Sequence, residues 1–168
     1  MPVLPDLLQE NLRLIICGSA VGQRSALIGH YYAGIGNKLW RTLQETGLTP
    51  SMLQPSEAPL LLRHGIGLTD LVKSQSGGDH SIRFDRSATA QLRAKILKYT
   101  PGYLCFNGKR AAQEFYAKKD VNYGLQPDPI GPTTLFVAPS TSAAANGSWD
   151  LSVWQELARQ VRSHNAAT

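Results

Sequence analysis

The chain has 168 residues, of which 42% are hydrophobic and 17% are charged, and its formal net charge is +5. This length suits a single domain (residues 1–168) with a substantial core, and the composition excludes a disordered chain or a coiled coil. No run of residues approaches the ~20 apolar positions of a membrane span, so we expect no membrane partner. The first ten residues lack a basic segment followed by an apolar one, which predicts no signal peptide and a cytoplasmic location.

Basic residues gather in one part of the chain. Between Arg83 and Lys119, nine Lys or Arg residues stand against two acids, a charge of +7, which leaves −2 for everything else. Such a stretch can hold a polyanion, because neutralising phosphates releases counterions. It is equally typical of a solvated helix face, so the charge alone does not decide between the two.

The first half of the chain predicts two strands. A short helix is expected over Pro5–Arg13, and the apolar run Leu12–Cys17 predicts a buried strand that stops at a glycine. A glycine-rich loop then runs over Gly18–Gly36, and a helix follows it. Ile66–Val72 predicts the second strand.

The second half continues the alternation of helices and strands. An amphipathic helix is expected over Ser87–Lys98, with Leu97 among its inward residues, and a final helix from Ser152. Strands are predicted over Tyr103–Asn107 and Thr133–Val137. Alternating strands and helices favour an α/β fold, here a three-layer α/β/α domain around a mainly parallel sheet of four strands.

Polar or glycine-rich residues follow each predicted strand. The strands end at Gly18–Ser19, Asp70, Asn107–Gly108 and Pro139–Ser140. Ligands of such sheets bind beyond the carboxyl ends of the strands, so we expect these four ends to converge on one crevice. One carboxylate, one amide, several hydroxyls and nearby tyrosines suit a polar planar ligand better than a metal.

Other site classes are disfavoured. The four histidines lack ligand spacing, and the two cysteines, Cys17 and Cys105, are expected to be buried reduced thiols, so no metal is predicted. Gly18-x-x-x-Gly22 lacks both the Lys-Ser or Lys-Thr of a phosphate-binding loop and the spacing of a dinucleotide motif.

Five segments in chain order resemble the motifs of one enzyme family. They are Cys17–Gly22 with its continuation through Gly29–Ala33 and Asn37–Trp40, then Gly67–Lys73, Phe106–Ala111, Ile130–Thr133 and Pro139–Ala143. Together they are similar to the uracil-DNA glycosylase superfamily, nearest to its mismatch-specific uracil and thymine branch. The likeness covers nearly the whole chain.

The resemblance implies a monofunctional, monomeric, bacterial-type enzyme of base excision repair. Such an enzyme flips uracil out of single- or double-stranded DNA and hydrolyses its N-glycosidic bond, leaving an abasic site, without a metal or other cofactor. One alternative keeps the fold and changes the base to hypoxanthine or xanthine, because the paired tyrosines and the Gly-Ser start resemble that branch. Others are a catalytically silent binder of uracil-containing or abasic DNA, and an α/β domain with an unrelated nucleotide ligand.

The resemblance also assigns the base-binding residues. Tyr32 matches the aromatic residue that stacks on the base, and Tyr31 either does this instead or seals the pocket. Asn107 matches a base-reading asparagine, whose amide offers both a donor and an acceptor. Gly18 allows close approach of the backbone, and Ala20, two residues further on in the same motif, is also assigned to the base pocket. The alternatives to these binding roles are structural: the two tyrosines would pack on the core, and Asn107 would end its strand by bonding to the local backbone.

A second set of residues is expected to contact the DNA backbone. A hydroxyl-rich loop can hold phosphates in register, and a basic residue at a helix start can contact them. These residues are Gly22, Lys109, Ser140, Thr141, Ser142 and Ala143. The small residues that follow, up to Asn146, occupy the place of the side chain that opens the duplex in the family, so weak duplex opening and a preference for single strands are a hypothesis.

The catalytic position departs from the family pattern. The branch has an asparagine in its first motif that positions the attacking water, and here that position is Ala20. Asp70 is a candidate replacement, because a carboxylate can orient water and stabilise a cationic sugar, and Ser19 is a second candidate. Asp70 can alternatively cap the following turn or pair with Lys73.

Overall fold

The sheet at the centre of the molecule has five strands in the order β2-β1-β3-β5-β4. The computed structural model describes residues 2–167, with side chains to residue 164. The strands β1 (Leu14–Gly18), β2 (Ile66–Asp70), β3 (Tyr103–Asn107) and β5 (Thr134–Ala138) are parallel, as predicted, and β4 (Gly124–Leu125) is antiparallel to β5. The prediction of four strands was therefore wrong by one. Strand β4 has only two residues, which lie in a turn-rich stretch without an apolar run. Only their pairing with β5 makes them a strand.

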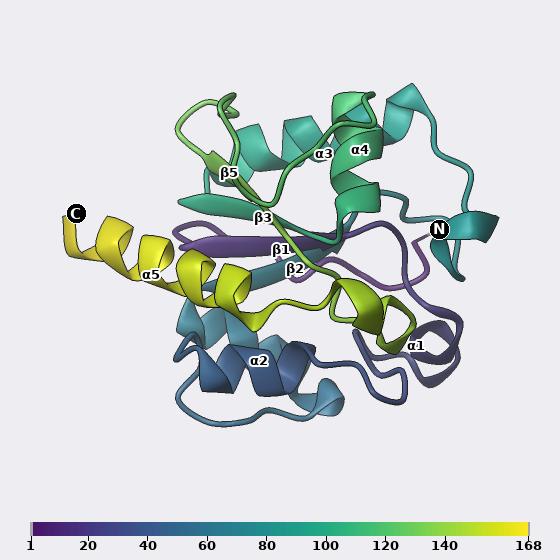
Figure 1. Cartoon of the computed structure of the whole chain (residues 1–168), viewed down its shortest axis with the longest axis horizontal. Coiled ribbons are helices and arrows are strands. Elements are labelled where there is room, and N and C mark those ends of the chain that lie inside the picture. The colour runs from purple at the N-terminus through teal and green to yellow at the C-terminus, as the bar shows by residue number, and fades with distance from the viewer. Residues whose placement is uncertain (1, 168) are drawn as a thin grey trace.

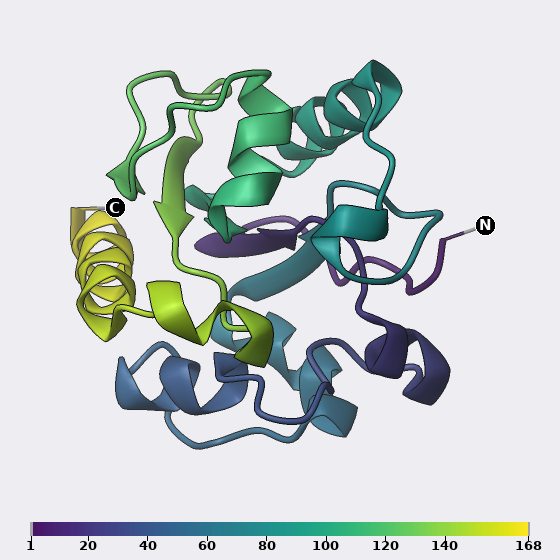
Figure 2. The same cartoon turned by 45° about the vertical axis from the view of Figure 1, so that its right-hand side comes forward.

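Helices cover both faces of this sheet, which confirms the α/β class (Figure 1). One face carries α3 (Arg86–Tyr99) and α4 (Lys109–Tyr116), and the other carries α2 (Leu39–Glu45), the 3₁₀ helix η1 (Pro55–His64) and α5 (Leu151–Ala167). Figure 2 shows the same separation from a second side. Three short helices, α1 (Gln23–Ile28), η2 (Asp79–Ser81) and η3 (Ala143–Ser148), complete the described chain. None of the described helices is both long and apolar enough to cross a membrane.

The residues of β1 alternate between two cores. Leu14 and Ile16 pack into the cluster with α2 and α5, and Ile15 and Cys17 pack into the cluster with α3 and α4. Because both faces are covered, the strand reads as one continuous apolar run. Cys105 is likewise buried, on the face opposite to Cys17, and both thiols are free.

The segment before β1 is not the predicted helix. Leu7 forms an isolated antiparallel bridge with Leu68 of β2, and both of its backbone groups bond there, at 2.9 and 3.0 Å. Gly67 permits this approach, since a Cβ on it would lie 2.5 Å from the Leu7 carbonyl oxygen. Hydrogen bonding along β2 has therefore overridden local helix propensity. We call residues 2–10 the N-terminal segment.

Two further expectations need correction. The glycine-rich loop Gly18–Gly36 contains the helix α1, which ends at Gly29 in a left-handed conformation with φ 86°. Leu97, expected to face inward, is 52% exposed, whereas Leu92 and Ile96 are buried. Leu92 and Ile96 lie four residues apart on one helix face, and Leu97 lies about 100° away from Ile96.

Candidate active site

The strand ends meet as predicted. Gly18 at the end of β1 is the direct partner of Asp70 at the end of β2, and Asn107 at the end of β3 is the partner of Ala138 in β5. The loop after α1 adds Tyr32, which packs against the core cluster on the α2 side. We call the space bordered by Gly18, Tyr32, Asp70 and Asn107 the crevice.

Gly18 keeps the crevice open. A Cβ on Gly18 would lie 3.2 Å from Oδ1 of Asp70 and 3.2 Å from the hydroxyl oxygen of Tyr32. The Asp70 carboxylate and the Tyr32 hydroxyl therefore border the space that a side chain at position 18 would fill. Glycine is required here for space, and this is the kind of close approach that a ligand can use.

Asp70 is a buried carboxylate with one oxygen committed and one turned to the crevice. Its residue is 3% exposed, and its Oδ2 accepts a hydrogen bond from Nζ of Lys73 at 3.1 Å. Burial raises the pKa of Asp70 above its usual value, and the Lys73 charge opposes this rise. The ion pair with Lys73, foreseen as an alternative role, is present, and it leaves Oδ1 facing Gly18.

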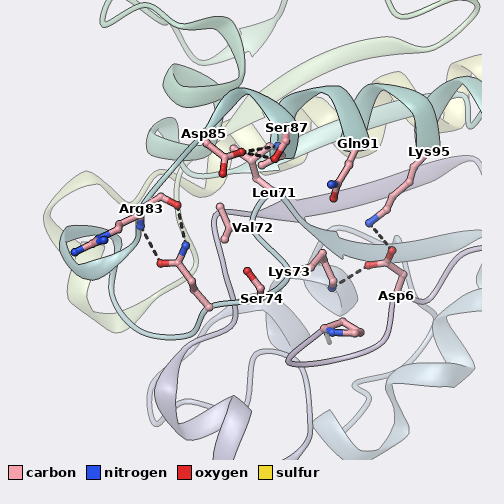
Figure 3. A pocket seen from close by; sticks show the side chains of 13 residues that line it. Asp6, Leu71, Val72, Lys73, Ser74, Arg83, Asp85, Ser87, Gln91 and Lys95 are labelled. Atoms are coloured by element: carbon pink, nitrogen blue, oxygen red, sulfur yellow. Dashed lines mark hydrogen bonds and ion pairs between the residues drawn. The ribbon is translucent and has the colours of Figure 1, made fainter.

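Lys73 belongs to a larger group of charges. Its Nζ lies 2.9 Å from Oδ1 of Asp6, in the N-terminal segment, and donates to the hydroxyl of Tyr31 at 2.9 Å. Lys95 of α3 reaches Oδ2 of the same Asp6 at 2.8 Å (Figure 3). We call Asp6, Asp70, Lys73 and Lys95 the charge cluster. Burial alone would lower the pKa of Lys73, but the two carboxylates raise it above its usual value, so its ammonium form is stabilised.

The two adjacent tyrosines differ in what they face. Tyr31 is 5% exposed, and its hydroxyl donates to the carbonyl of Pro5 at 3.0 Å, so it closes the site against the N-terminal segment. Tyr32 has a left-handed backbone, with φ 50°, fixed by a 3.1 Å hydrogen bond from Nε1 of Trp40 to its carbonyl. Its buried hydroxyl has no hydrogen-bond partner among the described residues. Strained backbone and an unsatisfied buried hydroxyl both favour a functional role for Tyr32.

Asn107 is held by the loop after β5. Its Nδ2 donates to Oγ1 of Thr141 at 3.0 Å, and its Oδ1 accepts from the backbone N–H of Thr141 at 3.0 Å. A backbone N–H can only donate, so this contact fixes which end of the amide is the oxygen. Each end keeps capacity for one more hydrogen bond. Burial raises the pKa of Tyr32, and Asn107 opposes this rise.

The candidate residues of the first motif, Ser19, Ala20 and Gly22, lie in different surroundings. Ala20 packs against the core on the α3 and α4 side, and Ser19 is buried, with its carbonyl accepting from the N–H of Val72 at 2.8 Å. Gly22 precedes α1 and has open space where a Cβ would be.

The predicted phosphate-contacting loop divides into inner and outer residues. Thr141 is 1% exposed and turned toward Asn107, whereas Ser140 and Ser142 accept hydrogen bonds from backbone N–H groups of the loop itself. Ala143 is exposed at the start of η3. Lys109, at the start of α4, lies 4.4 Å from the ring centre of Tyr123.

A hollow of about 440 Å³ lies next to the crevice, on the α3 side (Figure 3). Leu71, Val72 and Lys73, which follow Asp70, form one wall, and Arg83 and Lys95 are among its other lining residues. Asp6 could not be found from the sequence, because its partners lie more than 60 positions further along the chain and no local pattern signals them. Lys73 was signalled only by its spacing from Asp70.

Within the described residues, no group of three or more His, Cys, Asp or Glu side chains could hold a metal ion.

Residues 5–158 match the sequence model of the uracil DNA glycosylase superfamily. The chain belongs to this superfamily. A solved structure with the same fold is the solution NMR structure of a candidate uracil DNA glycosylase from Methanosarcina acetivorans, at a TM-score of 0.59 and 24% sequence identity. The superposition covers 95% of this chain and 96% of that chain. Membership makes the protein a DNA glycosylase, a hydrolase of N-glycosidic bonds whose partner is DNA, and it confirms the family expected from the sequence motifs.

Proposed function

We propose that the protein removes uracil from DNA by hydrolysing its N-glycosidic bond, with Asp70 as the catalytic carboxylate. The observation that carries the proposal is the position of Oδ1 of Asp70, which borders the space above Gly18 opposite the Tyr32 hydroxyl. The other oxygen is anchored by Lys73, so the free one has a fixed direction. A buried, oriented carboxylate at the ligand end of this sheet fits the cationic transition state of glycosidic cleavage.

The reaction needs the bond between C1′ and the base nitrogen to break. Its electron pair leaves with the base, and the sugar gains positive charge that the Asp70 carboxylate stabilises. A water oriented by the same carboxylate adds its oxygen to C1′, and its proton passes to the carboxylate or to solvent. The departing base anion takes up a proton from solvent, and the products are an abasic site and the free base. Ala20 offers a methyl group at the family's water-positioning place, which is why Asp70 is assigned this task.

The amide of Asn107 supports recognition of uracil. With its orientation fixed by Thr141, one N–H and one oxygen lone pair remain. These match the O4 acceptor and the N3–H donor of uracil. The Tyr32 ring and its unpartnered hydroxyl border the same space, and the ring is the candidate stacking surface.

We further propose that the enzyme is monofunctional and does not cleave the sugar–phosphate backbone. A lyase step needs a neutral amine that attacks C1′. Lys73 is the amine beside Asp70, and it is bonded to two carboxylates that favour its charged form. Incubation with borohydride should therefore trap no covalent complex with DNA.

A preference for single-stranded substrate forms a separate part of the proposal. The η3 turn presents alanines, with Ala143 exposed at its start, where a larger side chain would fill the gap left by a flipped nucleotide. Extrusion from a duplex then receives little help, and it is least costly from a single strand. Equal rates on single-stranded and duplex uracil would contradict this part.

The test incubates the protein with labelled oligonucleotides that carry uracil alone, U·G, U·A, T·G or hypoxanthine, and then cleaves abasic sites with alkali. Scission at uracil is the expected result. Scission only at hypoxanthine would contradict the proposed base and support the purine alternative. Retained binding to abasic DNA without any scission would show a silent binder, which is the outcome that loss of the motif asparagine at Ala20 would explain.

A further inference from the structure

The charge cluster contains two members, Asp6 and Lys95, whose role the proposed reaction does not explain. Asp6 comes from the N-terminal segment, contacts no residue of the crevice and yet accepts from three donors, two near the end of β2 and one on α3. These are Lys73 at 2.9 Å, Lys95 at 2.8 Å and the hydroxyl of Thr69 at 2.7 Å. Figure 3 shows Asp6 between the two lysines.

The charges of the cluster sum to zero only because Asp6 is present. Asp70 faces the crevice with one negative charge, and behind it stand Lys73 and Lys95 with two positive ones. The side chains of Asp70 and Lys73 are 3% and 14% exposed, so water screens their interaction only weakly. Without Asp6, two lysines would stand behind a single carboxylate, and the net charge of +1 would oppose a developing positive charge on the sugar.

We propose that Asp6 is a positioning residue that forms ion pairs with Lys95 and Lys73 and balances one of their two positive charges. The negative charge of Asp70 then remains available to stabilise the reacting sugar. This inference rests on the proposed function of Asp70. It gives the N-terminal segment a part in the reaction that the superfamily motifs do not include, since the segment precedes all five of them.

Each element packed around Asp70 supplies groups that bear on its titration. Lys73 lies three residues beyond the end of β2, and Asp6 lies in the N-terminal segment. Tyr31 and Tyr32 come from the loop after α1, and Cys17 lies on β1. The tyrosines and the thiol have pKa values raised by burial, so they stay neutral at moderate pH. Burial contributes most and raises the pKa of Asp70, Lys73 and the neutral Tyr31 lower it, and Asp6 raises it. Lys73 and Asp6 are therefore the charged groups among those that act on this pKa.

The experiment compares the full-length protein with Asp6→Asn and with the double variant Asp6→Asn/Lys95→Gln, which restores the zero sum. In single-turnover assays on a uracil oligonucleotide, Asp6→Asn should lose about tenfold in rate, the order that one unit charge exerts across a partly buried site. Its affinity for DNA should be equal or higher, because the site gains positive charge. The acid limb of its pH–rate profile should move to lower pH. The double variant should recover most of the rate and move the limb back.

The matched control is Asp6→Asn/Lys98→Gln, which removes the same charge from the same helix at an exposed position outside the cluster. It should recover nothing. An unchanged rate and an unmoved limb in Asp6→Asn would overturn the proposal. A loss that Lys95→Gln does not restore, in variants whose circular dichroism shows an intact fold, would assign Asp6 a merely structural role and overturn it too.

A readout without catalysis separates this proposal from the proposed function. NMR titration of the Asp70 carboxyl carbon should give a lower pKa in Asp6→Asn than in the unmodified protein, and a restored value in the double variant. If the unmodified protein cleaves no uracil while these shifts occur, the proposed function fails and the electrostatic coupling stands. If uracil is cleaved and the pKa of Asp70 is the same in Asp6→Asn as in the unmodified protein, the proposed coupling is contradicted and the proposed function is not.

Discussion

The ends of β2 and β3 hold their polar side chains by opposite means. At the end of β2, Asp70 is held by charge, through Lys73 and the acid behind it. At the end of β3, Asn107 is held by two neutral hydrogen bonds to Thr141. A charge placed in low dielectric acts strongly on a nearby cation, whereas an oriented amide discriminates between hydrogen-bonding edges. Under the proposed function, we therefore expect bond cleavage to depend on the β2 side of the crevice and base selection on the β3 side.

The largest expected effect comes from removing the charge at the β2 end. Asp70→Asn keeps the size of the side chain and should lower the cleavage rate about 10²-fold or more on every base that the enzyme accepts, with DNA affinity retained. Single-turnover rates and DNA binding measure the two quantities. Asp120→Asn, an exposed acid outside the cluster, is the matched control. A variant that binds and cleaves normally would remove Asp70 from the mechanism.

Removing the amide at the β3 end should give a different signature. Asn107→Ala loses hydrogen bonds to the base and leaves Thr141 with unpaired polar groups, so we expect about a 30-fold loss on uracil. The loss on hypoxanthine should differ, since its edge presents other groups. Ratios of kcat/KM for the two bases test this. Equal losses on both bases would deny Asn107 a role in selection.

The pH dependence should follow the β2 end alone. The pKa of Asp70 is raised above 3.8, mainly by burial, so the carboxylate is protonated at higher pH than a free one. If the ionised form acts, activity should be lost as pH falls through a value above 3.8. Asn107 does not titrate, so Asn107→Ala should leave this acid limb unmoved. A limb at or below 3.8 in the unmodified protein would contradict the assignment.

The smallest effect is expected from the residue that orients the amide. Thr141→Val removes the hydroxyl that accepts from Nδ2 of Asn107 but keeps the backbone N–H that fixes Oδ1. We expect a fall of about threefold in rate and a loss of about 1 kcal/mol in the free energy of unfolding. Rate assays and urea denaturation measure these quantities. A loss as large as that of Asn107→Ala would mean that the hydroxyl itself contacts the substrate.

The sequence predicted the strands and the crevice residues because their signals are local. Apolar runs that end at Gly18 or Asp70 mark buried parallel strands, and the fold then brings such ends together. Asp6 was placed in a helix and missed, because its partners Lys73 and Lys95 are remote in the chain. β4 was missed for the same reason, since two residues become a strand only through their pairing with β5.

The pairing of Leu7 with Leu68 has a consequence for the behaviour of the protein in solution. β2 is the outermost strand on its side of the sheet, and an unpaired outer strand invites self-association with a second copy. The N-terminal segment pairs with part of that strand through the Leu7 bridge, and a 2.7 Å hydrogen bond from the N–H of Val3 to the carbonyl of Lys73 holds it against the residues that follow the strand. The same few residues that carry Asp6 therefore also shield part of this outer strand, and we expect that trimming them would lower the solubility of the protein as well as its activity.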